Sequence, residues 1–174
     1  MPIKYLRGDA TYPQGVGPKY IVHVVNTRGG WGAGFVLAVS KRWKDPENMY
    51  RGWFRSGFYG TDEDERPVEF ELGNVQFVLV DHNGPLWVVN MLAQRGYGPK
   101  NQDQHRTAAD DAEIPLRYDA LESCLSKIAP NVRLAKASVH MPRIGCGLAG
   151  GRWEKVEPII QRVLGDVPVY VYDL

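Results

Sequence analysis

Two glycine-rich segments constrain the fold of this chain more than any other feature. Residues 26–34 read Asn-Thr-Arg-Gly-Gly-Trp-Gly-Ala-Gly, and residues 142–151 read Pro-Arg-Ile-Gly-Cys-Gly-Leu-Ala-Gly-Gly. Each segment follows a short apolar run typical of a strand and precedes a run with apolar residues at helical spacing. With four glycines each, they hold eight of the 19 glycines in the chain. Because glycine serves where the backbone turns with positive φ or approaches a ligand closely, the sequence predicts two similar strand–turn–helix units.

Strand-like and helix-like segments alternate along the whole sequence. The β-branched and apolar runs predict strands over residues 3–6, 20–26, 75–80, 86–91, 137–140 and 167–172, with a shorter one within 68–72. Apolar residues at helical spacing predict helices over residues 35–43, from 45 onward, from 115 onward and from 153 onward. We therefore expect an α/β fold with three layers, in which helices cover both faces of a mixed central sheet. A length of 174 residues suits a single domain over residues 1–174.

Several local signals refine these boundaries. Asp45 is expected to cap the second helix with Pro46 at its first position, and Pro158 is expected in or near the first turn of the last helix. Asn83-Gly84 favours a tight hairpin turn between the strands on either side, which should be antiparallel. Residues 98–113 are polar and lack periodicity, which is typical of a functional or mobile loop.

Charge and cysteine content exclude several classes of function. A formal net charge of +1 argues against nucleic-acid binding driven by bulk charge. The first residues contain no apolar run of the kind found in signal peptides, and no stretch approaches the ~20 apolar residues that a membrane span requires. Cys124 and Cys146 make neither a disulfide framework nor a zinc site. We therefore expect a monomeric cytoplasmic protein with no membrane partner, structural metal or cofactor.

Both glycine-rich segments have the layout of a phosphate-binding turn. The backbone N–H groups of such a turn point at one place beside a helix N-terminus, where partial positive charge favours an anion. Tight packing of a strand on its following helix is the alternative for either segment alone, whereas two segments on one sheet can hold a diphosphate. Gly145, Gly147 and Gly150 also match the dinucleotide fingerprint Gly-x-Gly-x-x-Gly. Since only one helix and one strand follow, and only Asp173 could supply the acidic partner, we do not expect a hydride-transfer enzyme.

Four motifs follow one another along most of the chain. They are Gly-Asp-Ala-Thr at residues 8–11, Val-Val-Asn at 24–26 with Gly-Trp-Gly-Ala-Gly-Phe at 30–35, Met-Pro-Arg-Ile-Gly-Cys-Gly-Leu at 141–148 and Val-Tyr-Val-Tyr at 169–172. In combination they resemble the macro domain, an ADP-ribose-binding module. The second and third motifs are most similar to the branch that contains the terminal ADP-ribose protein glycohydrolase and the ADP-ribose 1″-phosphate phosphatases. The resemblance implies the macro-domain fold and ADP-ribose as the ligand.

The resemblance also assigns a part of the ligand to each motif. Asp9 would accept a hydrogen bond from the adenine amino group, Asn26 would hold the distal ribose, and the two glycine-rich segments would hold the diphosphate. A plain turn carboxylate at Asp9, a strand-end cap at Asn26 and a core position at Tyr172 are the alternatives that the residues leave open. The implied ligand residues are Asp9, Ala10, Asn26, Gly30, Trp31, Gly32, Ala33, Gly34, Phe35, Arg143, Ile144, Gly145, Cys146, Gly147, Leu148, Ala149, Gly150 and Tyr172.

The sequence departs from the glycohydrolase pattern at the positions that carry its chemistry. In that enzyme a lysine after the hairpin strand attacks the ribose, and an acid directly after Gly-Cys-Gly-Leu assists. Here residues 90–96 contain no lysine and the acid position is Ala149, so a covalent lysine intermediate is not expected. Water must then be activated otherwise, and the catalytic candidates are Asn26, Gln94 and His23, with the bound phosphate as an alternative base. A satisfied core histidine is the alternative for His23.

These inferences predict a mono-ADP-ribosyl hydrolase. Its substrates would be proteins that carry ADP-ribose on acidic side chains, or a related C1″-linked ADP-ribose such as the 1″-phosphate, and it would need no metal. The alternatives are a reader that binds ADP-ribose without chemistry and a hydrolase of ADP-ribosylated DNA. The near-neutral charge and the missing lysine argue against the DNA-linked substrate.

Overall fold

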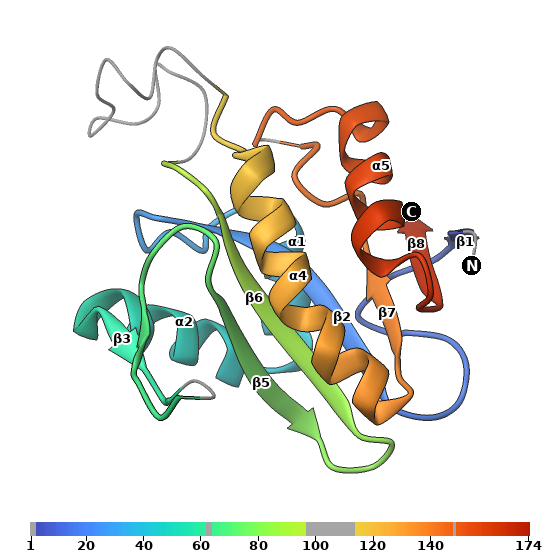
Figure 1. Cartoon of the computed structure of the whole chain (residues 1–174), viewed down its shortest axis with the longest axis horizontal. Coiled ribbons are helices and arrows are strands. Elements are labelled where there is room, and N and C mark those ends of the chain that lie inside the picture. The colour runs from blue at the N-terminus through green and yellow to red at the C-terminus, as the bar shows by residue number, and fades with distance from the viewer. Residues whose placement is uncertain (1–2, 62–63, 97–113, 148) are drawn as a thin grey trace.

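A computed structural model describes residues 3–61, 64–96, 114–147 and 149–174 of the chain (Figure 1). Its main sheet has the strand order β1-β8-β7-β2-β6-β5. In that order the strands are Lys4–Arg7, Val169–Asp173, Ser138–Met141, Lys19–Asn26, Leu86–Gln94 and Val75–Asp81. Neighbouring strands are parallel except for β5, which runs antiparallel to β6. The predicted loop at 98–113 lies outside the described residues.

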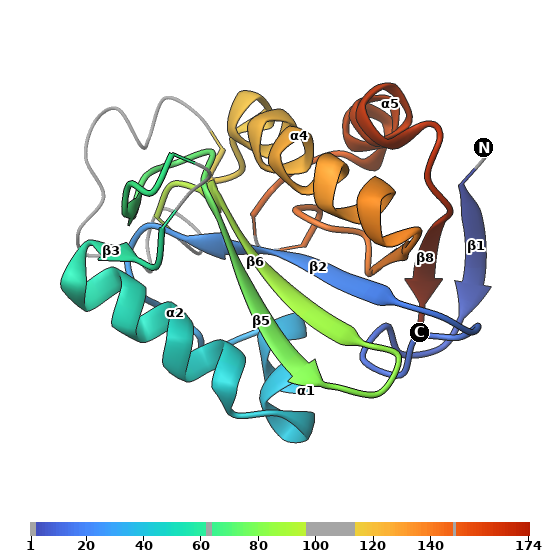
Figure 2. The ribbon, with the colours of Figure 1, turned by 60° about the horizontal axis from the view of Figure 1, so that its bottom comes forward.

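Helices cover both faces of this sheet (Figure 2). On one face lie α1 (Phe35–Arg42) and α2 (Asp45–Ser56), and on the other lie α4 (Tyr118–Ala135) and α5 (Trp153–Leu164). Two short strands, β3 (Phe58–Tyr59) and β4 (Val68–Glu69), pair with each other beside α2. The predicted three-layer α/β architecture with a mixed sheet is therefore confirmed. Within the described part of the chain, no helix is long and apolar enough to cross a membrane.

The central strand β2 shows why both faces need a helical layer. Ile21 and Val25 belong to the apolar cluster under α1 and α2, whereas Tyr20 and Val22 belong to the cluster under α4 and α5. Alternate residues of a strand point to opposite faces, so a continuous β-branched run is stable only when both faces are covered. The same alternation places His23 on the α1/α2 face, together with Ile21 and Val25.

Two helix starts differ from the sequence prediction. The second helix begins at Asp45 itself, with Lys44 at the capping position and no side-chain cap, so the prediction that Asp45 caps the helix was wrong. Helix α4 begins at Tyr118 rather than at Pro115, where the sequence predicted its start. Residues 115–117 instead run along β6, because the N–H groups of Arg95 and Arg117 bond to the carbonyls of Pro115 and Ala93. Pairing with the sheet thus keeps this segment extended and delays the helix.

Two smaller predictions also need correction. Pro158 is the sixth residue of α5, beyond its first turn, and the helix continues through it. The strands β5 and β6 are antiparallel as predicted, but four residues, 82–85, connect them in place of a two-residue turn. Only Gly84 of the Asn-Gly pair has positive φ, at 119°. Asn83 instead donates its N–H to the Asp81 carboxylate at 2.8 Å.

Candidate functional site

A cavity of about 600 Å³ opens at the carboxyl ends of β2, β6 and β7. It lies between residues 26–34, here called the first glycine loop, and residues 142–151, the second glycine loop. Parallel strands of an open α/β sheet bring their carboxyl ends to one edge, which is where such folds bind ligands. The two glycine loops that the sequence singled out therefore lie on opposite sides of one cavity.

The cavity wall contains most of the predicted site residues. Those that line it are His23, Asn26, Gly30, Trp31, Gly32, Ala33, Gly34, Phe35, Gln94, Arg143, Ile144, Gly145, Gly147 and Ala149. Five others are not part of the wall: Asp9, Ala10, Cys146, Gly150 and Tyr172. Leu148 lies outside the described residues. The wall also contains residues that the sequence analysis did not predict, namely Val24, Val25, Val36, Arg51 and Pro142.

Asn26 folds the first glycine loop back on itself. Its Oδ1 accepts hydrogen bonds from the Arg28 N–H at 2.9 Å, the Gly30 N–H at 3.1 Å and the Tyr50 hydroxyl at 3.0 Å. Its Nδ2 donates to the Gly30 carbonyl at 2.8 Å. The side chain thus has the strand-end capping role that was the alternative to ribose binding. The second proton on Asn26 Nδ2 has no partner among the described residues, so it can donate a hydrogen bond to a ligand.

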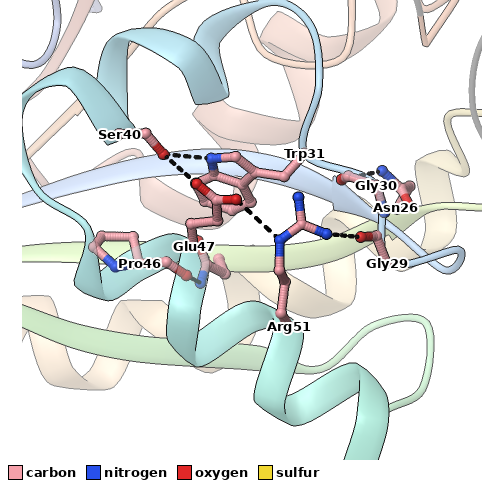
Figure 3. Close-up of polar contacts among 9 residues, drawn as sticks. Asn26, Gly29, Gly30, Trp31, Ser40, Pro46, Glu47 and Arg51 are labelled. Carbon is pink, nitrogen blue, oxygen red and sulfur yellow. Dashed lines mark hydrogen bonds and ion pairs between the residues drawn. The ribbon is translucent and has the colours of Figure 1, made fainter.

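A chain of polar side chains fastens the same loop to α1 and α2 (Figure 3). The Trp31 indole donates to Ser40 Oγ at 2.7 Å, and Ser40 donates to Glu47 at 3.0 Å. The other Glu47 oxygen accepts from Arg51 Nε at 2.9 Å, and Arg51 Nη1 donates to the Gly29 carbonyl at 3.0 Å. The hydrogen bond from Arg51 is the main cause that lowers the pKa of Glu47, so this carboxylate stays ionised.

Arg51 is not among the residues predicted from the sequence, because its link to the site is tertiary. Glu47 and Arg51 are four residues apart on one helix, a spacing that usually marks a solvent-exposed ion pair. No motif near Arg51 connects it with a glycine loop that lies about twenty residues earlier in the chain. The acidic residue followed by an arginine after one helical turn was the only local signal.

Asn26 and Gln94 lie side by side at the base of the cavity. A register shift between Val25 and Asn26 makes Asn26 and Gln94 cross-strand partners of β2 and β6. Gln94 Nε2 donates to the Gly96 carbonyl at 3.0 Å. This bond fixes the orientation of the Gln94 amide. Its Oε1 can then accept a hydrogen bond from water or from a ligand.

His23 lines the cavity as a neutral side chain. Asn90 Nδ2 donates to Gln76 Oε1 at 3.0 Å and to the Pro46 carbonyl at 3.2 Å. The Asn90 oxygen is therefore the acceptor for His23 Nε2, 2.6 Å away, and this contact places the imidazole proton on Nε2. Nδ1 is left as a buried lone pair with no partner among the described residues. Burial lowers the pKa of His23 to about 4, which makes it a weak base.

The two buried histidines should make stability depend on pH. Burial is the main cause that lowers the pKa of both His23 and His140 to about 4, from 6.5 when unfolded. The unfolded chain binds more protons between these values, so the free energy of unfolding should fall as pH drops below 6.5. Each histidine should contribute a slope of about 1.4 kcal/mol per pH unit. Urea midpoints between pH 7 and 5 measure this slope, and His23→Gln should halve it; a flat profile would contradict the assignment.

Arg143 is committed to an ion pair. Its Nε and Nη2 donate to the two carboxylate oxygens of Asp173 at 2.8 and 3.0 Å, and this pair raises the pKa of Arg143. The guanidinium also lies 5.2 Å from the ring centroids of both Tyr5 and Trp153. Its charge is therefore largely balanced at the rim of the cavity, beside the end of β8.

The predicted adenine residues lie beyond the β7 side of the cavity. Asp9 Oδ1 accepts from both the N–H and the hydroxyl of Thr11 at 2.8 Å, which is a local turn of the kind foreseen as its alternative. Tyr172 is only 3% exposed, and its hydroxyl contacts His140 Nδ1 at 2.7 Å. These contacts give both residues structural partners next to the carboxyl ends of β1 and β8.

The glycines of the two loops fall into two physical classes. A Cβ on Gly29 would lie 2.6 Å from the Phe54 ring, and one on Gly145 would lie 2.7 Å from Leu116, so packing explains these glycines. A Cβ on Gly32 or Gly147 would meet no heavy atom of the described residues within 4 Å, and neither residue has positive φ. Both line the cavity. Within the described part of the chain, neither packing nor backbone conformation requires glycine at these two positions of the cavity wall.

Comparison with solved structures finds close matches over the full chain. A protein of unknown function from Bacteroides thetaiotaomicron is 48% identical with a TM-score of 0.83, and the match covers 100% of this chain and 99% of that one. A macrodomain protein from Streptomyces coelicolor is 43% identical with a TM-score of 0.76, and the match covers 99% of both chains. No family model matches the sequence.

Two curated relatives differ in how much of their length is matched. The chromodomain-helicase-DNA-binding protein 1-like of Mus musculus is 31% identical over 98% of this chain, but the chain spans only 17% of that protein. An ADP-ribose 1″-phosphate phosphatase of Candida albicans is 24% identical, and the match covers 91% of this chain and 92% of the phosphatase.

Proposed function

Because the chain belongs to the macro domain family, we propose that it binds ADP-ribose in the cavity between the two glycine loops. We further propose that it hydrolyses ADP-ribose from modified acidic side chains of proteins, or from a related C1″-linked ADP-ribose. The similarity to an ADP-ribose 1″-phosphate phosphatase over nearly the whole chain supports a substrate bonded at C1″. The reaction uses no covalent lysine intermediate.

The two glycines without a packing role carry the proposal. Gly32 and Gly147 belong to different loops, both line the cavity, and both leave open space where a side chain would stand. A diphosphate between the loops could approach both backbones and accept hydrogen bonds from their N–H groups. Such a ligand needs little charge from the protein, which agrees with a net charge of +1.

The order of the strands gives the ligand a direction. The residues proposed for adenine, Asp9 and Tyr172, belong to the β1/β8 end of the sheet, and the loops follow β7 and β2. Asn26 and Gln94 end β2 and β6, further along the same edge. An extended ADP-ribose therefore has its adenine near β8, its diphosphate between the loops and its distal ribose beside Asn26 and Gln94.

The side chains at the distal end favour orientation of water over strong base catalysis. The described cavity wall contains no lysine, aspartate or glutamate, and Ala149 stands in the acid position. His23 has a pKa of about 4 and is a weak base. Gln94 Oε1 and the Asn26 amide can orient a water molecule and the ribose hydroxyls. An ester has a good leaving group, so orientation and polarisation at C1″ can suffice.

Release of ADP-ribose from a modified protein tests the function. An ADP-ribosyltransferase that has modified itself on glutamate is incubated with the chain, and the protein-bound label is followed over time. We expect release that exceeds the spontaneous rate and that free ADP-ribose inhibits. Release at the spontaneous rate, with ADP-ribose binding retained, would show that the protein is a reader that binds ADP-ribose without catalysing its release. The missing lysine and the neutral His23 are the observations that favour that second function.

A further inference from the structure

The charges of the cavity wall are unevenly distributed. Among the described residues, the charged side chains in the wall are Arg51 and Arg143. Arg143 is bonded through two nitrogens to Asp173. Arg51 lies on α2 and bonds to the Gly29 carbonyl of the first glycine loop, with 40% of its side chain exposed. The side of the cavity formed by Asn26 and the first glycine loop therefore carries a guanidinium that a ligand can reach (Figure 3).

The contacts of Arg51 fix its guanidinium without covering it. Nε donates to Glu47 and Nη1 to the Gly29 carbonyl, whereas the third nitrogen, Nη2, lies on the side of Trp31 and has no partner among the residues drawn in Figure 3. Glu47 is not part of the cavity wall. It also accepts from Ser40, which holds the Trp31 indole. One carboxylate behind the wall thus positions both an aromatic ring and a cation that face the ligand.

We propose that Arg51 is the residue that selects an oxyanion bonded to C1″ of the distal ribose. The proposal rests on the proposed function, because it uses the position proposed there for the distal ribose, beside Asn26 and Gln94. A guanidinium held by two other bonds loses little further entropy when it binds an anion, and its hydrogen bonds to an oxyanion are charge-assisted. Free ADP-ribose has a neutral hydroxyl at C1″ and should gain little from this contact.

Two substrates would present an oxyanion at C1″ to Arg51, but at different stages of the reaction. A phosphate on C1″ is already anionic, so Arg51 should contribute to its ground-state affinity. A glutamate ester is neutral when bound and becomes anionic only as it is cleaved. In that step water oxygen bonds to C1″, the C1″–O bond breaks with its electron pair on the departing carboxylate, and the surplus water proton passes to solvent. Arg51 should then stabilise the carboxylate that forms in the transition state.

Arg51→Gln separates these effects. Calorimetry with the variant should show at least a tenfold weaker affinity for ADP-ribose 1″-phosphate and less than a threefold change for ADP-ribose. On a glutamate-linked peptide, kcat should fall at least tenfold with little change in KM. Arg51→Lys should restore part of both losses. Arg55→Gln removes the same charge from an exposed position one turn later on the same helix and should change neither ligand's affinity.

Several outcomes would overturn the proposal. Equal losses for ADP-ribose and its 1″-phosphate would show that Arg51 only holds the glycine loop, and no loss for either would exclude any contact. Wild-type protein that binds neither ligand would overturn the proposal and the site together. Wild-type protein that binds both ligands but releases no ADP-ribose would refute hydrolysis, while the affinity ratio of the two ligands would still decide the role of Arg51.

Discussion

Replacing Gly32 with leucine should weaken ADP-ribose binding at least ~100-fold, which corresponds to about 2.7 kcal/mol. Gly32 lies in the cavity wall with ordinary φ, and its Cβ would enter open space. The leucine can therefore be accommodated by the folded protein, but it occupies the volume proposed for the diphosphate. Calorimetric titration with ADP-ribose measures the loss, and thermal unfolding shows whether the fold is kept. Gly147→Leu should have the same effect from the other loop.

Gly52→Leu is the matched control for this experiment. Gly52 lies on α2, a Cβ there would also meet no heavy atom of the described residues within 4 Å, and the residue is not among those that line the cavity. Its substitution should leave the affinity for ADP-ribose within about twofold of wild type. Retained affinity in Gly32→Leu would refute the placement of the ligand between the loops. A loss in the Gly52 variant as large as that in the Gly32 variant would show that the assay reports on stability.

Gln94→Ala should lower kcat for release of glutamate-linked ADP-ribose by about 10- to 100-fold. Gln94 is the cross-strand partner of Asn26, and its bond to the Gly96 carbonyl leaves Oε1 as an acceptor beside the distal ribose. Alanine removes the atom that would orient the attacking water, while the glycine loops that hold the diphosphate remain. Single-turnover release measures the chemical step, and calorimetry measures ADP-ribose affinity separately.

A particular pattern in these two measurements identifies the role of Gln94. We expect the rate to fall and the affinity for ADP-ribose to change less than about threefold, because only the transition state should lose stabilisation. Gln76→Ala is not a suitable control, since Gln76 belongs to the buried network of Asn90. The exposed Gln161 is suitable, and its substitution should change neither quantity. Unchanged release in Gln94→Ala would show that water is oriented by another group.

Sequence patterns predicted the fold because its signals are local. The β-branched run of β2 and the glycine loop after it are each recognised from neighbouring residues. The structure contains both, as a strand and as part of the cavity wall. The start of α4 was not predictable in this way. Residues 115–117 have no strand pattern of their own, and they stay extended because β6 supplies partners for their backbone groups.

The candidate site was predictable where consecutive residues of the two glycine loops form the cavity wall. Gly32 and Gly147 stood out in sequence, but only the structure separates them from Gly145, whose Cβ would collide with Leu116. Arg51 was missed because the sequence of its helix does not indicate that the helix contacts the first glycine loop. Likewise, the neutral state of His23 depends on its burial in the folded protein, and its tautomer depends on Asn90, a residue that lies on another strand.

A crystal structure of the chain with ADP-ribose tests the central claim most directly. The diphosphate should lie between residues 30–34 and 142–150, with backbone N–H groups of both loops bonded to its oxygens. The distal ribose should lie beside Asn26, Gln94 and Arg51, with a water near C1″ within reach of Gln94 Oε1. A diphosphate that contacts neither Gly32 nor Gly147, or a distal ribose at the β8 end of the cavity, would contradict it.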